Sequence, residues 1–357
     1  MQTLTPLETD PSSDSSLGAD APEAIRWREV LRPYTRATLG RGLFSLATSV
    51  VPFMLLWAAM YFALDVSYFL TLALAVPAAG FLLRTYILFH DCAHSSLLPG
   101  RRANALVGGA LGVLVFTPFA KWRYEHTIHH ATSGDLDRRF TGDVPTLTIA
   151  EYQAWPLMGR VGYRLFRSPV VMFGLGPIWA MLLDTRFPRP SASRRIKRSV
   201  LMTDLALVLV IGGLCLLIGW QSFVLVEAPF VFLAGGAGIW LFYVQHQFDD
   251  AYWKRSAEWN FEDAALLGSS YLKLPKILQF FTGNIGLHHA HHLSSRIPNY
   301  NLQRAHDGVP KLNSVRAMSF REGLRVTRLK LYDEDADRMV TWREVRRART
   351  GSALSAH

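Results

Sequence analysis

The sequence predicts an all-α integral membrane protein, in which four transmembrane helices form two hairpins and a cytosolic helical cap holds a dimetal site. Three observations support this fold class. Half of the 357 residues are hydrophobic, and they concentrate in two long stretches with few charges. Basic residues flank these stretches and avoid their interiors. Ten of the twelve histidines fall in three short clusters and one separate position, with spacings typical of metal sites.

The chain begins with a polar segment. Residues 1–24 are mildly acidic and rich in Ser, Asp and Pro, and they lack the basic start and apolar core of a signal peptide. This composition predicts a disordered N-terminal tail. We expect the membrane domain over residues 25–310 and a cytosolic C-terminal extension over 311–357. The two cysteines, Cys92 and Cys215, are too few to form a disulfide framework.

Each long apolar stretch is about twice the ~20 residues that cross a bilayer. Between Leu43 and Leu83, Asp65 is the only charged residue, and no Lys or Arg occurs from Ser199 to Trp253. Each stretch therefore predicts a helical hairpin. We expect transmembrane spans near 43–64, 66–89, 200–220 and 223–246.

The distribution of basic residues predicts the orientation. Arginines are frequent before the first hairpin, between the hairpins and after Lys254, whereas the tips around Asp65 and Gln221 have none. The positive-inside rule then places both termini and the central segment in the cytosol, as in a multi-pass protein of a bacterial inner membrane. Two shorter apolar segments, 103–119 and 170–183, are flanked by basic residues. We expect them to lie in the cytosolic leaflet or to dip into it.

The histidine clusters predict two metal ions. Residues three and four apart on a helix share a face, so HxxxH directs two imidazoles one way and HxxHH directs three. The predicted topology places the first cluster and His246 at the cytosolic ends of spans and the other two clusters in cytosolic segments. All four can therefore meet on one face, where they supply more nitrogen donors than one metal can take. The candidate ligands are His90, His94, His126, His129, His130, His246, His288, His291 and His292. His289 lies off the helical face and is expected to be a bystander. His306 and His357 are expected to be ordinary surface residues.

Four polar residues are candidates for the surroundings of the metals. Asp91, Asp249 and Asp250 are candidates to accept the second ring N–H of a histidine ligand. The alternative is that these carboxylates are simply solvated at the membrane edge. Asn284 has the position of a helix N-cap, and a role near the metals is the alternative.

The histidine ligands limit which metals and which reactions the site suits. Imidazole suits zinc, iron, copper and nickel. Zinc hydrolases combine their ligands with a positioned carboxylate, as in HExxH, and no such motif occurs here. Many nitrogen ligands around two irons suit oxygen activation instead.

The motifs HDCAH at 90–94, HTIHH at 126–130 and HHAHH at 288–292 resemble the three histidine boxes of membrane fatty acid desaturases. The flanking runs HHATSGDLD and GNIGLHHAHHL strengthen the resemblance, which is to the acyl-lipid branch that includes bacterial Δ12-type (omega-6) enzymes. It implies a diiron centre held by the eight box histidines and His246. It also implies O2 as co-substrate and a cis double bond introduced into a lipid-linked acyl chain. Three residues, rather than four, separate His90 from His94, which favours a lipid ester over acyl-CoA.

The resemblance also implies an external source of electrons, because the chain has no motif of a fused cytochrome b5. The net charge of +10 is suited to an acidic carrier such as ferredoxin. Alternatively, the charge serves membrane topology and anionic lipid. No nucleic-acid partner is expected.

Two other functions remain as alternatives. One is a fatty acid hydroxylase or a carotenoid hydroxylase or ketolase on the same scaffold. The other is a metal transporter, which is disfavoured because transporters place their ionisable ligands at mid-membrane. The predicted spans contain no histidine away from their cytosolic ends, and Asp204 and Glu227 are poor candidates.

Overall fold

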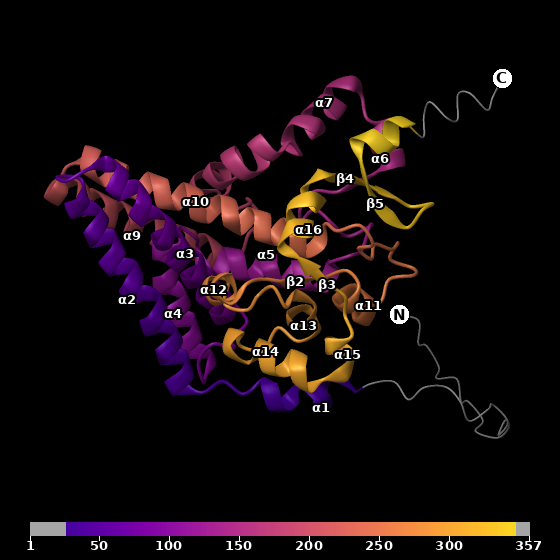
Figure 1. Cartoon of the computed structure of the whole chain (residues 1–357), viewed down its shortest axis with the longest axis horizontal. Helices are drawn as coiled ribbons and strands as arrows, with labels where there is room; N and C mark the ends of the chain where they lie inside the picture. Colours follow the sequence, from indigo (N-terminus) through magenta and orange to yellow (C-terminus); the bar gives the residue numbers. More distant parts are fainter. Residues whose placement is uncertain (1–25, 348–357) are drawn as a thin grey trace, which may run out of the picture.

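The computed structural model describes residues 26–347 (Figure 1). The tail predicted over 1–24 and His357 therefore lie outside the described residues. Four long apolar helices form two hairpins: α2 (Leu39–Ala63) with α3 (Tyr68–Ala93), and α9 (Arg194–Ile218) with α10 (Trp220–His246). Each is long and apolar enough to cross a membrane. The four predicted spans thus correspond to four long apolar helices, and α9 begins six residues before its predicted start.

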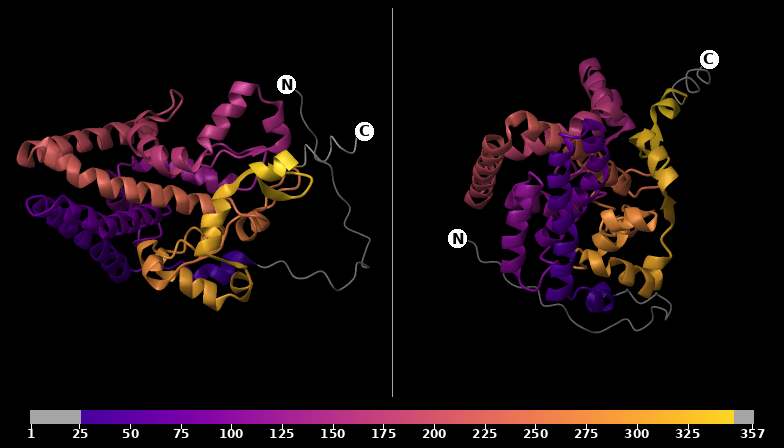
Figure 2. Two further views of the ribbon diagram at one scale, coloured as in Figure 1. Left: turned by 45° about the horizontal axis from the view of Figure 1, so that its top comes forward. Right: turned by 60° about the vertical axis from the view of Figure 1, so that its left-hand side comes forward.

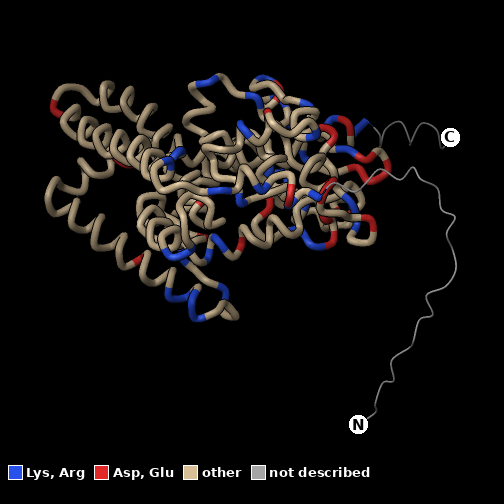
Figure 3. The backbone as a smooth tube through the Cα atoms, turned by 90° about the horizontal axis from the view of Figure 1, so that it is seen from below, with Lys and Arg blue, Asp and Glu red and all other residues tan. Residues whose placement is uncertain are grey.

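The two hairpins diverge from a common cap, and their tips point away from it (Figure 2). Gly219 joins α9 to α10 with a φ of 82°, a conformation that side chains with a Cβ rarely adopt. Large apolar side chains such as Phe62, Phe69 and Leu216 are exposed on the hairpins. Charged residues gather at the opposite end of the molecule, near both ends of the described chain (Figure 3). The apolar exterior of the hairpins is suited to lipid, and the charged cap is suited to water.

Short helices build the cap and the segments beneath it. They are α1 (Trp27–Leu31), α4 (Arg101–Leu114), α5 (Phe119–Thr132), α6 (Ile149–Ala154), α7 (Leu157–Phe166), α8 (Gly176–Ile178), α11 (Phe261–Leu266), α12 (Lys276–Phe281), α13 (His288–Leu293), α14 (Asn299–Gly308), α15 (Pro310–Asn313) and α16 (Phe320–Arg325). Two π-helical segments, 170–175 and 179–183, flank α8, and single 3-10 turns occur at 32–34, 184–186 and 326–328.

The cap also contains two small β-sheets, which the all-α prediction missed. Strand β1 (Leu147–Thr148) runs parallel to β4 (Leu329–Asp333), and β4 is antiparallel to β5 (Arg338–Thr341). Strand β2 (Tyr271–Lys273) runs parallel to β3 (Ala317–Ser319). These strands are too short to produce the alternation of apolar and polar residues that identifies a strand in a sequence.

The segment after residue 310 is part of the cap core. Met318, Tyr332 and Met339 are buried in the same hydrophobic cluster as Tyr243 of α10 and Leu272 of β2. Strands β3 and β4 each pair with a strand from before residue 310. Within the described residues, no structural break separates the predicted C-terminal extension from the membrane domain.

The two shorter apolar segments belong to bent helix pairs. Helices α4 and α5 meet at 103°, and α7 meets the helical stretch 170–186 at 60°. Helix α4 starts soon after α3 ends at the cap. Helix α5 returns to the same end, as the packing of its His130 ring against the His94 ring shows. The guanidinium of Arg186 donates to the carbonyl oxygen of Phe116 at the α4–α5 bend and pairs with Asp204 of α9. By length and composition alone each bent pair could form a fifth or sixth span. The return of α5 to the cap matches a re-entrant segment.

This arrangement predicts a labelling pattern in intact cells. Cysteines introduced at Asp65 and Gln221 should react with an impermeant maleimide from outside, because the positive-inside rule predicts a cytosolic cap. A cysteine at Arg138, an exposed cap residue, should react only after the cells are opened. Cys215 should first be replaced by Ser because it lies near the α9 tip, whereas Cys92 is buried. Labelling of only one tip from outside would contradict the paired hairpins, and outside labelling at Arg138 would contradict the orientation.

Candidate metal centre

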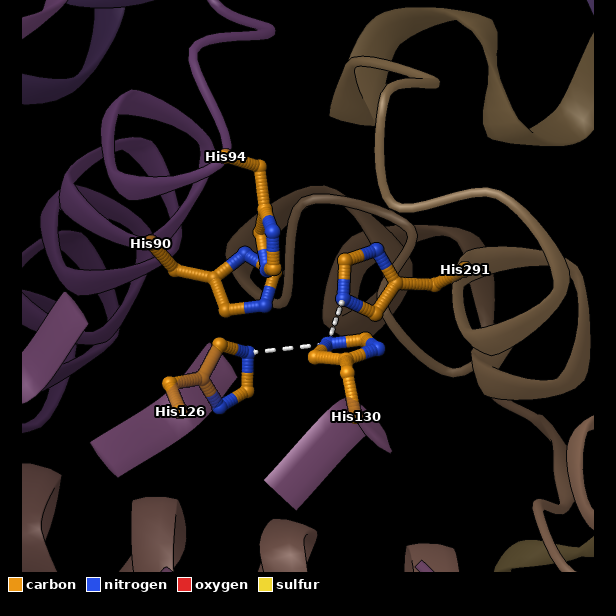
Figure 4. Close-up of side chains that lie close together, drawn as sticks. All are labelled: His90, His94, His126, His130 and His291. Carbon is orange, nitrogen blue, oxygen red and sulfur yellow. Dashed lines mark hydrogen bonds between the residues drawn. The ribbon is translucent and has the colours of Figure 1, made fainter. Parts of the chain in front are cut away.

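Nine histidines from four helices form two neighbouring groups. The first contains His90 and His94 from the end of α3, His126 and His130 from α5, and His291 from α13 (Figure 4). The second contains His129, His246, His288 and His292. Within each group the ligand nitrogens all lie within 4.8 Å of one another. The structure thus brings together all nine histidines that the sequence singled out, in two groups as expected for two metals.

Helix geometry divides the clusters between the groups. His126 and His130 are four apart on α5 and face the first group, while His129 faces the second. On α13, His288 and His292 are four apart and face the second group, while His291 faces the first. Each HxxHH motif therefore supplies both groups, and the stacked rings of His130 and His292, 4.2 Å apart, mark the boundary between them.

The nitrogen spacings fit coordination better than hydrogen bonding. In the first group, the Nε2 atom of His130 lies 3.1 Å from that of His126 and 3.1 Å from that of His291. A ring nitrogen has one N–H or one lone pair, so at most one of these two contacts is a hydrogen bond. Nitrogens bound to one cation through bonds of about 2.1 Å lie roughly 3 Å apart. The Nε2 atoms of His90 and His94 are buried without a hydrogen-bond partner among the described residues.

The second group has the same spacing. The Nε2 atoms of His246 and His288 are 3.0 Å apart, and those of His129 and His292 are 3.2 Å apart. Burial, together with neighbouring histidines, lowers the pKa of His94, His288, His291 and His292 well below the ordinary value. These imidazoles therefore remain neutral, which is the form that binds metals. A set of nitrogen donors without carboxylates suits a transition metal rather than Mg²⁺ or Ca²⁺.

Hydrogen bonds behind the rings fix their orientation. Asp91 lies 3.2 Å from the Nδ1 atom of His90, and it also accepts bonds from the backbone and side-chain nitrogens of Asn299, at 2.7 and 2.8 Å. The Nδ1 atom of His246 lies 3.2 Å from the carbonyl oxygen of Gly268. An N–H on Nδ1 donates to each of these oxygens and leaves Nε2 free for a metal.

Asp143 has the same role for His129, and sequence reasoning missed it. Its carboxylate contacts the Nδ1 atom of His129, and both side chains are buried. Asp143 lies fourteen residues after His129 in an irregular segment, so no helical periodicity relates the two residues. The signal that identified Asp91, which is adjacency to a histidine in the sequence, does not exist for Asp143.

Three predicted neighbours of the metals lie elsewhere. Asp249 is exposed, and its carboxylate accepts a hydrogen bond of 2.8 Å from Arg325. Asp250 is also exposed, in a surface pocket beside Asp249. The chain turns outward after α10 ends at His246, which carries both carboxylates away from the histidines. Asn284 is not an N-cap, because α13 begins at His288; it takes a left-handed φ of 61°, and its side chain donates to the carbonyl oxygen of Asn299.

His289 lies outside both groups, as expected, but it is buried and contacts another histidine. Its Nε2 atom is 3.3 Å from the Nδ1 atom of His306, and the ring of Tyr271 packs against both. Burial lowers the pKa of His289 to about 3, with a smaller contribution from His306. The prediction that His306 is a surface residue is wrong, because this side chain is only 4% exposed. A lone histidine has no spacing that distinguishes a buried position from an exposed one.

An apolar cavity leads to both histidine groups. It has a volume of roughly 300 Å³ and lies between α3, α5, α10 and the segment around α8. His90 and His126 of the first group and His288 of the second line one end. Along α10 the lining extends from Gln245 to Ala234, roughly 16 Å at 1.5 Å per residue. A narrow apolar cavity that ends on two metal-binding groups is suited to an extended hydrocarbon chain.

The fold and the site together define a multi-pass membrane protein with two histidine groups that could each hold a metal ion. The chain belongs to the membrane fatty acid desaturase family, because the family model "Fatty acid desaturase" matches residues 66–318. The protein is therefore a fatty acid desaturase, an oxidoreductase. The family match and the geometry agree on the site, since the matched range contains all nine grouped histidines.

Individual relatives support the family and differ in the detail of their names. A fatty acid desaturase of Bacillus subtilis (strain 168) is 45% identical over 305 residues, which cover 85% of this chain and 87% of that protein. The sn-1 oleoyl-lipid 12-desaturase of Synechocystis sp. is 26% identical over 63% of this chain and 64% of its own length. The sn-1 acyl-lipid omega-3 desaturase (ferredoxin) of Nostoc sp. is 26% identical, and 63% of each chain is covered.

Replacing Asp143 by Asn should weaken metal retention without unfolding the protein. The amide keeps the shape of the carboxylate but loses the charge that favours the Nδ1–H form of His129. Loss of such a partner costs 10–100-fold in metal affinity. Metal content should be measured after dialysis against a graded series of chelator. Asp249→Asn is the matched control, and it should retain metal like the unmodified protein. Equal retention by the two variants would remove Asp143 from the metal site.

His289→Ala should lower the melting temperature and leave the metal content intact. The change leaves the buried His306 ring without its partner, which costs about 1–3 kcal/mol. His306→Ala should have a similar effect, and the double variant should lose less than the sum of the two. His288→Ala should instead lose metal, because its ring belongs to the second group. Metal loss in His289→Ala at a temperature where the protein is folded would contradict this division.

Proposed function

We propose that the protein is an acyl-lipid desaturase that introduces a cis double bond into a membrane-bound acyl chain at a diiron centre. The observation that carries this proposal is the cavity, which is lined mainly by apolar residues and also by His90, His126 and His288. A hydrocarbon substrate in this cavity would have a methylene carbon beside both histidine groups. A transporter is not supported, because no histidine of the described spans lies away from the cap end.

We propose that His90, His94, His126, His130 and His291 hold one iron and that His129, His246, His288 and His292 hold the other. These are the two sets whose nitrogens converge. When bound, two irons supply the activation of O2 that the cleavage of an unactivated C–H bond requires. Asp91, Asp143 and the carbonyl oxygen of Gly268 would keep the rings of His90, His129 and His246 in the metal-binding tautomer.

The protein side chains would position the substrate and exclude water. The indole of Trp122 stacks on the ring of His126, with ring centres 4.3 Å apart, and also lines the cavity beside Tyr86. These rings and the walls from α3 and α10 would fix one pair of methylene carbons at the histidine end. Removal of two hydrogen atoms and reduction of O2 to two waters needs two further electrons and two protons from outside the substrate. An iron–sulfur carrier such as ferredoxin is the proposed source of the electrons.

For the position of the double bond we propose a Δ12-like specificity. The support comes from relatives at low identity, such as the Synechocystis 12-desaturase at 26%. The name of the more similar Bacillus relative contains no position. The orientation that we propose, with the cap in the cytosol of a bacterial inner membrane, rests on the basic residues of the cap and would give a soluble carrier access to it.

The deciding experiment is reconstitution of the purified protein. Apoprotein should be loaded anaerobically with ferrous iron, because an all-nitrogen site also binds zinc and a zinc-loaded preparation would be inactive. The loaded protein should bind about two irons and consume O2 only with a ferredoxin system and oleoyl lipid present. Mass spectrometry of the lipids should show a new double bond on the methyl side of the existing one. His291→Ala protein, prepared in the same way, serves as the inactive control.

Each other outcome of the reconstitution has a definite meaning. A double bond elsewhere in the chain would refute the Δ12-like position and keep the desaturase. A hydroxylated product would favour the hydroxylase alternative. No oxygen-dependent change in any lipid, with two reducible irons bound, would refute the proposed activity.

A further inference from the structure

Six arginines lie at the starts of α4 and α9 and on α5, three helices that pack against one another near the cap ends of the hairpins. None of them has a hydrogen bond or an ion pair to a carboxylate among residues 26–347. Arg186, which lies at the bend between α4 and α5, differs from them because it pairs with Asp204 of α9. The members of this arginine cluster are Arg101 and Arg102 at the start of α4, Arg123 on α5, and Arg194, Arg195 and Arg198 in the first turns of α9.

Packing of the three helices holds these charges together. The backbone N–H of Ala120 on α5 donates to the Ser199 hydroxyl of α9 at 3.0 Å. Gly108 lets α4 approach α5 closely, since a Cβ there would lie 2.2 Å from the ring of Phe119. Burial, together with the charges of Arg195 and Arg101, lowers the pKa of Arg123. Like charges held this close repel one another, and an anion between them would offset the repulsion.

The surroundings of the cluster place it at the level of lipid headgroups. Leu106 of α4 is 76% exposed, and Leu201 and Met202 of α9 are 57% and 55% exposed. These apolar side chains follow the arginines by one to two turns and face outward, so they are suited to lipid tails. A guanidinium beside such residues lies at the interface between tails and water. This position favours a lipid phosphate over a soluble anion.

The cluster is also connected to the metal centre. Arg123 directly follows Trp122, whose ring lines the cavity and stacks on His126. A phospholipid held by its phosphate at Arg123 would therefore have its acyl chains beside the apolar cavity.

We propose that Arg101, Arg123 and Arg195, with the three neighbouring arginines around them, bind the phosphate of an anionic phospholipid. Arginine suits this role because its planar fork of donors binds phosphate oxygens in pairs. The bound lipid would be presented to the cavity, so the cluster would select anionic lipids as substrates. This selection rests on the proposed acyl-lipid activity, whereas the binding itself does not.

Binding should be tested with metal-free protein in neutral detergent. Phosphatidylglycerol and phosphatidylcholine with identical acyl chains are added in equal amounts, and mass spectrometry counts the lipids retained after gel filtration. The unmodified protein should prefer phosphatidylglycerol, and the preference should weaken at high salt. Each arginine near an anionic lipid changes affinity about fivefold, so the triple variant Arg101→Gln, Arg123→Gln, Arg195→Gln should lose most of it. Lysine at the same three positions keeps the charge and should restore part of the preference.

A second triple variant is the matched control. Arg304, Arg321 and Arg328 are exposed residues of the cap away from the cluster, and their replacement by Gln removes the same total charge. This control should keep the preference. Equal loss in both triple variants would overturn the proposal, because net charge alone would then explain the effect. Binding of inorganic phosphate as strong as that of phosphatidylglycerol would also overturn the proposal, because the site would then recognise a soluble anion.

Iron-loaded protein in mixed vesicles separates the headgroup site from the proposed function. The unmodified protein should modify phosphatidylglycerol faster than phosphatidylcholine, and the cluster variant should modify the two equally while retaining activity on phosphatidylcholine. A selective binding loss without turnover of any lipid would refute the desaturase proposal and support the headgroup site. Turnover of lipid with no binding preference in the unmodified protein would refute the headgroup site alone.

Discussion

The structure depends on one constraint: nine imidazoles are packed together inside the molecule, and their ring nitrogens converge on two points. Nε2 atoms of neighbouring histidines lie 3.0–3.2 Å apart, and hydrogen bonds among these atoms cannot account for all the contacts. Cations at the two points would replace repulsion between lone pairs with coordination. Metal binding at these points would therefore be coupled to the assembly of the cap, since the unfolded chain contains neither arrangement.

The membrane hairpins and the irregular cap contribute to this constraint in different ways. Helices α3 and α10 are long and end at the site, so each delivers its histidines on a rigid support. Helix α13 has six residues and is too short to be stable alone. Two backbone hydrogen bonds hold the start of α13. The N–H of His288 donates to the carbonyl oxygen of Ser270, and the N–H of Leu272 donates to the carbonyl oxygen of Gly286 at 2.7 Å. A Cβ on Gly286 would lie 2.4 Å from the oxygen of Leu272, so only glycine permits this approach.

The sequence predicted what is encoded over short distances. Spans appear as uninterrupted apolar runs, and HxxxH or HxxHH spacing is a direct consequence of the helix, so His90 and His94 or His126 and His130 could be paired from sequence. Contacts between distant segments left no such signal. Asp143 reaches His129 and Asn299 reaches Asp91 only through the folded cap. The burial of His306 was mispredicted, and the position of Asp249 was left open between two alternatives, for the same reason: neither depends on local periodicity.

The division of each HxxHH motif between two groups limits how the centre can assemble. His129 and His130 are sequence neighbours, yet they face different groups, and so do His291 and His292. A rotation of α5 or α13 that improved one group would therefore distort the other. Because the helices are shared, the geometry of one histidine group depends on that of the other. The cavity shares the same walls, since His90, His126 and His288 line it. In the proposed enzyme, the helix orientations that set the two metal positions would therefore also set the end of the substrate site where the reaction occurs.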